Sequence, residues 1–332
     1  MAHQPAPGKL SFLITGGAGF IGSALAEHLS ENTNYRVVIM DDLSTGSLKN
    51  IAHIKDRPNV VFHKMDIRDR EACLEACEGI DIVLHHAALG SIPRSIDDPV
   101  NTNSVNVTGF LNMLDAARKK NVKRFVYASS SSVYGDDKRM PKEEAHTGKP
   151  LSPYAVTKCA NELYAEVFAK TYGMEIIGLR YFNVFGPRQN VNGPYAAVIP
   201  IFIRQMMKGE PCTIFGDGKN TRDFTFVNNV VSAVVKTALT ENKEAPGKVY
   251  NIACGFSISV LDVYNRIAAL MNSSEPPHFA PARTGDIAGS LASINKATEF
   301  LGYAPVMSVE DGLGKTVEWY KSNRSWIFPE QE

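Results

Sequence analysis

Short apolar runs alternate with longer helical patterns over the first half of the chain, and this alternation constrains the fold more than any other feature. The runs are rich in Val and Ile and almost continuously apolar, which is typical of strands buried on both faces. They are Leu10–Thr15, Tyr35–Asp41, Val60–Asp66, Ile80–His85, Arg124–Ser129 and Glu175–Arg180. Apolar residues recur at helical spacing in Ile21–Glu31, Arg68–Cys77, Asn106–Lys120 and Tyr154–Tyr172. The order predicts an α/β fold, a parallel sheet with helices on both faces.

A glycine-rich segment, Thr15–Gly22, joins the first predicted strand to the first predicted helix. Gly16 permits a tight turn, Gly19 lets the backbone approach a pyrophosphate, and Gly22 allows the helix to pack closely on the strand. The N-terminus of the helix then faces the phosphates. Glycines also occur in plain turns, but here a strand precedes and a helix follows. The segment therefore predicts a Rossmann-type doubly wound sheet that binds a dinucleotide.

Carboxylates at two strand ends indicate which dinucleotide binds. Asp41 ends the second apolar run, 25 residues after Gly16, where a carboxylate accepts both adenosine ribose hydroxyls and repels a 2′-phosphate. This predicts NAD instead of NADP, with Asp42 as a solvated turn residue. Asp66, at the end of the third run, is placed either to meet the adenine edge or to cap the helix at Arg68.

The regular alternation fades after Tyr181, where segments punctuated by Pro and Gly begin. A further strand, Val249–Ile252, and a helix, Asn228–Leu239, have the texture of the first part of the chain. We therefore expect an NAD-binding domain of residues 1–183 plus 228–252. A smaller, mixed α/β domain for the substrate would comprise residues 184–227 plus 253–332.

Tyr154 and Lys158 form the first part of a predicted catalytic group. Ser152 is a good N-cap and Pro153 a good first residue for a helix, so Tyr154 and Lys158, four apart, share one helix face. A tyrosine with a pKa near 10 needs about 1.4 kcal/mol of preferential phenolate stabilisation for each unit by which its pKa falls. A nearby ammonium and a positively charged nicotinamide ring supply it. The pair alone is a weak signal, because Tyr and Lys often share an ordinary amphipathic helix.

Four serines, Ser129 to Ser132, strengthen this interpretation because they end a predicted parallel strand. Ligands bind at that edge of such sheets, and a hydroxyl there could hold the reacting hydroxyl of a substrate against Tyr154. The serines could instead be ordinary turn residues.

Composition excludes several classes of function. The 332 residues are 44% hydrophobic, with 35 basic and 35 acidic residues, a balance unlike that of nucleic-acid or membrane-surface proteins. No apolar run approaches the roughly 18 residues of a membrane span, so we expect a cytoplasmic protein with a small-molecule partner. The five cysteines include no CxxC pair, and Cys73 and Cys77 are better read as apolar helix residues than as a metal or redox pair.

Three motifs in this order, GGAGFIG, SSSSVYG and YAVTK, resemble the extended short-chain dehydrogenase/reductase family. Within it, Leu89–Ser95 and Gln189 after Phe185–Arg188 resemble the bacterial UDP-N-acetylglucosamine 4-epimerases. The resemblance spans nearly the whole chain and implies a tightly bound NAD. It makes Ser130, Tyr154 and Lys158 the catalytic residues. It places the cofactor against Gly16, Gly19, Phe20, Ile21, Gly22, Asp41, Asp66, Ile67, Ala87, Ala88, Asn106, Tyr154, Lys158 and Tyr181. His85 and His86 are then wall residues, and no metal is expected.

The segment before Val133 separates the reactions of this family. Dehydratases and uronic-acid decarboxylases resemble one another in carrying an acidic residue there, whereas Ser129–Ser132 has no Asp or Glu. No side-chain acid is therefore placed to drive elimination. Removal of hydride from C4 of the sugar, rotation of the 4-keto sugar and return of hydride to its other face remain. This is epimerisation, with NAD regenerated in each cycle.

The resemblance also implies a UDP-sugar as the substrate. It suggests that Asn183, Arg222 and Arg283 bind the diphosphate, where arginine forks suit its oxygens, and that the uracil lies at Ala197 and Val198. Ser290 matches a tyrosine that limits space at the sugar C2 in galactose-type epimerases, so it leaves room for an N-acetyl group. The expected substrate contacts are Gly90, Arg94, Ser130, Ser131, Asn183, Gln189, Ala197, Val198, Arg222, Arg283 and Ser290. The segments 192–194 and 287–289 depart from the family pattern.

We therefore expect interconversion of UDP-GlcNAc and UDP-GalNAc. UDP-N-acetyl uronic acids are an alternative, because Arg94 could pair with a C6 carboxylate, and UDP-glucose and UDP-glucuronate are others. An NAD-binding regulator is the non-enzyme alternative, which the intact Ser130, Tyr154 and Lys158 disfavour. We also expect a homodimer, in which Asn106–Lys120 and Tyr154–Tyr172 pair with a second copy as a four-helix bundle.

Overall fold

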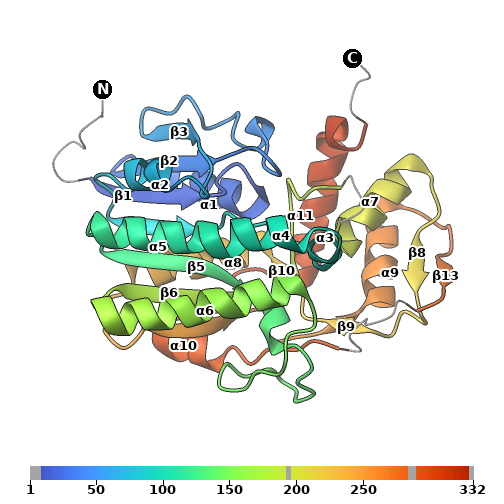
Figure 1. Ribbon diagram of the computed structural model, residues 1–332. Helices are drawn as coiled ribbons and strands as arrows, with labels where there is room; N and C mark the ends of the chain where they lie inside the picture. The colour runs from blue at the N-terminus through green and yellow to red at the C-terminus, as the bar shows by residue number, and fades with distance from the viewer. Residues whose placement is uncertain (1–8, 192–195, 283–288, 329–332) are drawn as a thin grey trace.

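A seven-stranded sheet, parallel throughout, forms the centre of the molecule (Figure 1). The computed structural model describes residues 9–191, 196–282 and 289–328. The strand order is β11-β6-β5-β4-β1-β2-β3. The strands are β1 (Leu10–Thr15), β2 (Tyr35–Asp41), β3 (Val60–Lys64), β4 (Ile82–His85), β5 (Arg124–Ser130), β6 (Glu175–Tyr181) and β11 (Lys248–Ile252). The prediction of a Rossmann-type α/β fold is confirmed, and every strand proposed from the sequence is present.

Helices cover both faces of this sheet, as the alternating strand side chains require. Leu13 and Val38 pack in a core with α2 (Arg70–Ala76), α5 (Phe110–Lys119) and α6 (Pro153–Tyr172). Their neighbours Ile14 and Val37 point the other way, into a core that includes α1 (Phe20–Ser30) and α8 (Val227–Leu239). Figure 1 shows α5 and α6 across the front of the sheet and α8 behind it.

Beyond the carboxyl end of the sheet lies a region of short strands and helices, on the right of Figure 1. Its helices are α7 (Val198–Lys208), α9 (Val260–Met271) and α11 (Val309–Ser322). Its paired strands are β7 (Val184–Phe185) with β10 (Thr225–Phe226), β8 (Thr213–Phe215) with β13 (His278–Ala280), and β9 (Thr221–Arg222) with β12 (Ile258–Ser259). α8 and β11 return to the large sheet, while α10 (Asn295–Leu301) packs against β11. The division into two discontinuous domains remains our proposal.

The helix expected at Asn106–Lys120 begins earlier in the structure. α3 (Ile92–Asp97) is followed at once by α4 (Pro99–Asn103), a π-helical segment at Ser104–Gly109, and α5. The run rich in Asp, Asn and Pro has the composition of a turn, but Asp98 is an N-cap that accepts from the Asn101 N–H, and Pro99 is the first helical residue. The expected start was therefore wrong.

Smaller corrections concern the third strand and the helix after it. β3 ends at Lys64 instead of Asp66, and α2 runs from Arg70 to Ala76 with Asp69 as its N-cap. Asp66 therefore does not cap this helix. Ser152, in contrast, is the expected N-cap of α6 and accepts from the Ala155 N–H at 3.2 Å. Across the described ranges, no helix combines the length and the apolar character needed to cross a membrane.

Candidate active site

A cavity of about 1010 Å³ lies at the carboxyl ends of the sheet strands. Residues at the ends of β1, β2, β4, β5 and β6, which are adjacent in the sheet, contribute to its wall. Of the residues predicted from the sequence, it brings together Gly16, Gly19, Phe20, Ile21, Gly22, Asp41, Ile67, Ala87, Ala88, Gly90, Arg94, Ser130, Ser131, Tyr154, Lys158, Tyr181, Asn183, Gln189 and Ala197. Asp66, Asn106 and Ser290 stand behind this wall, and Arg283 lies outside the described residues.

The glycine loop has the shape that a dinucleotide requires. Gly16 has a φ of +67°, and a Cβ at this position would lie 2.7 Å from the backbone N of Ala87. A Cβ at Gly22 would lie 2.1 Å from the carbonyl oxygen of Gly16. Gly19 is the N-cap of α1, so no side chain stands at the position just before the helix. The loop can hold the pyrophosphate of NAD against the helix N-terminus.

Asp41, at the end of β2, lines the large cavity in the part where the sequence predicts the adenosine of NAD, called the adenosine part below. Its carboxylate accepts the N–H groups of Ala18 and Leu43 at 2.9 and 2.8 Å, which fixes it against the glycine loop. Burial raises the pKa of Asp41, although these N–H donors oppose the shift. Asp42 is also in the wall, but its carboxylate accepts from the N–H and hydroxyl groups of Ser44.

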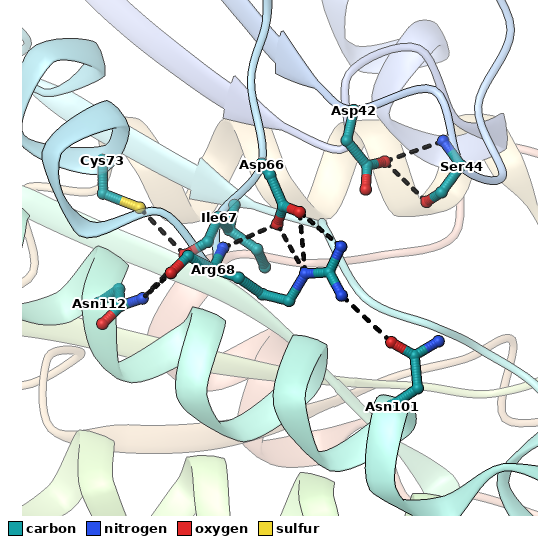
Figure 2. A network of polar contacts seen from close by, with 8 residues as sticks. All are labelled: Asp42, Ser44, Asp66, Ile67, Arg68, Cys73, Asn101 and Asn112. Carbon is teal, nitrogen blue, oxygen red and sulfur yellow. Dashed lines mark hydrogen bonds and ion pairs between the residues drawn. The ribbon is translucent and has the colours of Figure 1, made fainter.

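Asp66 belongs to a polar network (Figure 2) next to Ile67, which lines the large cavity. Its carboxylate accepts the Arg68 N–H at 2.8 Å and is also held by the Arg68 guanidinium, whose hydrogen bonds lower the pKa of Asp66. The guanidinium extends to Asn101 on α4. Asp66 is therefore set in place by Arg68, while its neighbour Ile67 forms the wall.

Ser130, Tyr154 and Lys158 meet in the cavity, as their positions in the sequence suggested. Burial raises the pKa of Tyr154, and a hydrogen bond between the side chains of Ser130 and Tyr154 opposes this. The Lys158 ammonium lies 5.8 Å from the centre of the Tyr154 ring and donates to the carbonyl oxygen of Ala128 at 2.8 Å. Burial lowers the pKa of Lys158 to about 8, and Glu162 opposes that shift.

Ser129 differs from Ser130 although the two are adjacent. The Ser129 hydroxyl donates to Glu162, whose carboxylate also accepts from the buried guanidinium of Arg180. Glu162 is therefore paired behind the wall and does not line the cavity. This leaves Ser130 as the hydroxyl next to Tyr154 and explains why Arg180 is a structural residue.

Of the two histidines expected to be wall residues, His86 lines the cavity and His85 does not. His85 is buried behind the cavity, where its Nδ1 lies 2.9 Å from the Thr15 hydroxyl. His86 lines the cavity, and its Nε2 lies 2.8 Å from the hydroxyl of Tyr181. Burial lowers the pKa of His86 to about 4, so it is neutral at neutral pH. The described part of the chain contains no group of three or more metal-binding side chains.

Asn106 acts on the cavity through its neighbours. Its side chain accepts from the Leu89 N–H at 2.7 Å and donates to the Leu89 carbonyl and to the Thr157 hydroxyl, both at 3.1 Å. Leu89 lines the cavity and Thr157 lies on α6 beside Lys158. Asn106 thus joins the loop after β4 to the helix that carries the predicted catalytic tyrosine. It lies in the π-helical segment, and such segments often mark functional sites.

A second cavity, of about 260 Å³, shares Asn183, Val184 and Ala197 with the first. Val198 and Arg222 also line it, so four of the residues predicted to bind UDP gather there. Asn183 has a φ of +35°, and its Nδ2 donates to the Asp223 carbonyl and to the Ser290 hydroxyl at 3.0 and 3.2 Å. Ser290, predicted to border the sugar, therefore contacts Asn183, a residue that lines both cavities.

Sequence reasoning missed several residues of the large cavity. They include Lys49, Arg188, Ser325 and Trp326. The Lys49 ammonium donates to the Ser325 hydroxyl at 3.0 Å and lies 4.8 Å from the centre of a Trp326 ring. These partners are 276 positions apart, so no local spacing indicated that they meet. For Arg188, its position immediately before Gln189 was the one signal available.

Comparison with known proteins agrees with this site. Residues 12–253 match the family described as the NAD dependent epimerase/dehydratase family. A putative UDP-glucose 4-epimerase of Methanocaldococcus jannaschii is 36% identical over 313 residues, which cover 94% of this chain and 98% of that protein.

Solved structures are similar over nearly the whole chain. One is a UDP-N-acetylglucosamine 4-epimerase of Methanobrevibacter ruminantium M1 in complex with UDP-N-acetylmuramic acid, with a TM-score of 0.90, 35% identity, and 95% of this chain and 99% of that chain covered. Another is a UDP-glucuronic acid 4-epimerase of Bacillus cereus in complex with UDP-glucuronic acid and NAD, with a TM-score of 0.87, 33% identity, and 95% and 100% covered. This chain therefore belongs to the NAD dependent epimerase/dehydratase family, with NAD as its cofactor.

Proposed function

We propose that this protein interconverts UDP-GlcNAc and UDP-GalNAc by epimerisation at C4 through a 4-keto intermediate. We infer the reaction type from the positions of the carboxylates in the cavity wall. Among the described residues that line the large cavity, the carboxylates are Asp41 and Asp42, both in the adenosine part. Around Ser130 and Tyr154 the described cavity wall places no carboxylate to protonate a leaving hydroxyl, so elimination lacks its acid there.

The residues present can perform each proton transfer of an epimerisation. When bound, NAD supplies an acceptor and donor of hydride for the sugar C4. Tyr154 takes the proton from the C4 hydroxyl and returns it, while Ser130 holds that oxygen by a hydrogen bond. Lys158 favours the phenolate through its positive charge. Burial alone raises the pKa of Tyr154, so the positive charges of Lys158 and of the oxidised nicotinamide ring have to lower it.

The choice of an N-acetylated sugar rests on Ser290. Its small side chain contacts Asn183, which borders both cavities, and a tyrosine at this position would occupy more volume next to Asn183. The similarity to a UDP-N-acetylglucosamine 4-epimerase supports this choice. Arg94 in the wall and the similarity to a UDP-glucuronic acid 4-epimerase favour an acidic sugar as the second candidate.

The experiment that tests the proposal is an assay of the purified protein with separate substrates. UDP-GlcNAc, UDP-glucose, UDP-glucuronate and UDP-N-acetylglucosaminuronic acid are each incubated with the protein, and the C4 epimers are separated by chromatography. We expect UDP-GalNAc from UDP-GlcNAc with the highest kcat/KM. If UDP-glucose alone turns over, the assignment of Ser290 is wrong. A product lacking the C6 hydroxyl would mean a dehydratase.

We also propose a homodimer through α6 and the helices beside it. Val156, Leu163 and Val167, at helical spacing on α6, are 53%, 65% and 55% exposed. Ile96 on α3 and Val100 on α4 are 61% and 79% exposed, and both helices pack against α6. A dimer would cover this apolar surface, whereas Leu163→Asp should give monomers in size-exclusion light scattering. A monomeric wild-type protein would contradict the proposal. The cytoplasmic location stays a prediction.

A further inference from the structure

Arg188, in the loop between β7 and α7, reaches across to the helix that follows the glycine loop. Its guanidinium forms an ion pair with Glu27 on α1, and its Nη1 lies 3.2 Å from Nε2 of His53. His53 is in turn 3.1 Å from the Glu27 carboxylate. The Arg188 side chain is 13% exposed. Burial alone would raise the pKa of Glu27, but Arg188 and His53 hold it below its ordinary value.

The backbone at Arg188 is strained, and the contacts of its side chain with Glu27 and His53 must offset the energetic cost of that strain. Its φ is +68°, in the left-handed region, which disfavours residues with a Cβ. Strained conformations of this kind persist where the surroundings over-determine them, and they concentrate at ligand sites. The side-chain contacts on α1 are therefore holding a loop in a conformation that its own sequence disfavours.

The residue fixed by this arrangement is Gln189, which lines the large cavity. Its Nε2 donates to the Val184 carbonyl at 3.1 Å, and its own backbone carbonyl accepts from the Tyr320 hydroxyl. The side-chain oxygen Oε1 is buried and has no hydrogen-bond partner within the described ranges. A buried amide oxygen of this kind is costly unless a ligand donates to it.

We propose that Arg188 is a positioning residue for the epimerase, a step that rests on the proposed function. Its ion pair with Glu27 fixes residues 186–190 on α1, so that the Oε1 atom of Gln189 accepts a hydrogen bond from the bound sugar. The donor is a hydroxyl or the acetamido N–H. The pair thereby fixes the position of the sugar-binding loop relative to the glycine loop, because Glu27 lies on α1, the helix that directly follows the glycine loop.

A direct role is the alternative, because Arg188 also lines the cavity and its Nε is buried without a partner among the described residues. In that case Arg188 would bind the diphosphate itself and Glu27 would be incidental. The two roles differ in how the effects of substitutions combine. A residue that acts through Glu27 loses its function when either partner changes, so the double variant is no worse than a single one.

The test uses the NAD-loaded enzyme and the variants Glu27→Gln, Arg188→Gln, their combination and Arg188→Lys. We expect the KM for UDP-GlcNAc to rise about tenfold to a hundredfold in both single variants and equally in the double variant, since misplacement of a positioning group costs this much. Bound NAD per subunit and kcat should stay within about twofold of wild type, and Arg188→Lys should recover part of the KM. The matched control is Arg266→Gln, which removes an exposed ion pair with Glu310 away from both cavities.

Each outcome separates the two proposals. Additive effects, or a KM that changes only in Arg188→Gln, would overturn the role through Glu27. An unchanged KM in all variants of an active enzyme would also overturn it. A purely structural ion pair would lower kcat, bound NAD and thermal stability together without a selective change in KM. If the wild-type protein epimerises none of the UDP-sugars tested, the proposed function itself has failed.

Discussion

The cofactor part and the substrate part of the site are built in different ways. Gly16, Asp41, His86, Ser130 and Tyr181 each end a sheet strand or directly follow one, and the five strands are adjacent. The cofactor wall is therefore a property of the sheet itself.

The substrate part has no such frame. Asn183, Ala197, Arg222 and Ser290 come from four separate segments, carried by two-residue strands or by loops. The difference indicates where specificity can change. We propose that the chemistry is anchored to the sheet, whereas sugar choice depends on contacts between segments that the sheet does not hold.

The largest effect should follow from Tyr154→Phe, at the point where the two parts meet. Removal of the hydroxyl deletes the proton acceptor, so we expect kcat to fall by about 10²–10⁴. Phe keeps the aromatic ring, so NAD should remain bound. The bound NAD is measured by the absorbance of the supernatant after the protein has been denatured. Tyr164→Phe, on the exposed side of the same helix, is the control and should behave as wild type. Retained turnover in Tyr154→Phe would exclude the proposed mechanism.

The next effect tests the cofactor part alone. In Gly22→Ala the new Cβ would lie 2.1 Å from the Gly16 carbonyl and 2.7 Å from the Gly17 Cα, both backbone atoms that cannot move cheaply. We expect the purified variant to have lost most of its bound NAD. Gly314→Ala is the control, because on α11 nothing lies within 4 Å of the new Cβ. That change should add about 1 kcal/mol of stability instead. A Gly22→Ala protein with full NAD would contradict the described packing of α1.

The sequence predicted the cofactor part of the site better than the substrate part. The seven sheet strands and the wall residues at their ends were predictable because buried parallel strands are continuous apolar runs, and their carboxyl ends share one edge. The start of the helix at Pro99 was not, since Asp98 and Pro99 fit a turn as well as a cap. Only the hydrogen bond that the Asn101 N–H donates to the Asp98 carboxylate decides between them.

Contacts over long sequence separations could not be predicted at all. Arg188 and Glu27 are 161 positions apart, and nothing near either residue marks it as paired. For Ser290 the sequence supplied only a family resemblance. Its contact with Asn183, 107 positions away, needed the tertiary structure.

A smaller effect is expected from a change in the substrate part. Ser290→Tyr should lower kcat/KM for UDP-GlcNAc by about tenfold to a hundredfold, since a hydrophobic mismatch of this kind changes discrimination by a few kcal/mol. The value for UDP-glucose should fall less. Ser290→Ala keeps the volume and removes the hydrogen bond from Asn183, so it separates size from polarity. If Ser290→Tyr changes both substrates equally, Ser290 does not set the choice of sugar.

The last effect concerns the stability of the NAD-free protein instead of its activity, and it measures the cost of burying Lys158 in the cofactor part. Burial lowers the pKa of Lys158 from 10.5 to about 8. Between pH 8 and pH 10.5 the unfolded chain binds more protons than the folded chain. The contribution of Lys158 to the free energy of unfolding therefore rises with pH across this window, and it is lost as the pH falls through 8. In Lys158→Met this dependence is absent. The free energy of unfolding of wild type should therefore rise with pH relative to that of the variant. The difference, variant minus wild type, should decrease by up to about 3 kcal/mol from pH 7 to pH 10.

Chemical denaturation of both proteins at several pH values measures this difference. Met also removes the hydrogen bond to the Ala128 carbonyl, which lowers the stability of the variant by the same amount at every pH and leaves the slope intact. Lys219→Met, where the side chain is 84% exposed, should show no slope. A difference independent of pH would mean that Lys158 is not desolvated in the folded protein. The cofactor part would then lack the buried, desolvated lysine by which it differs from the substrate part.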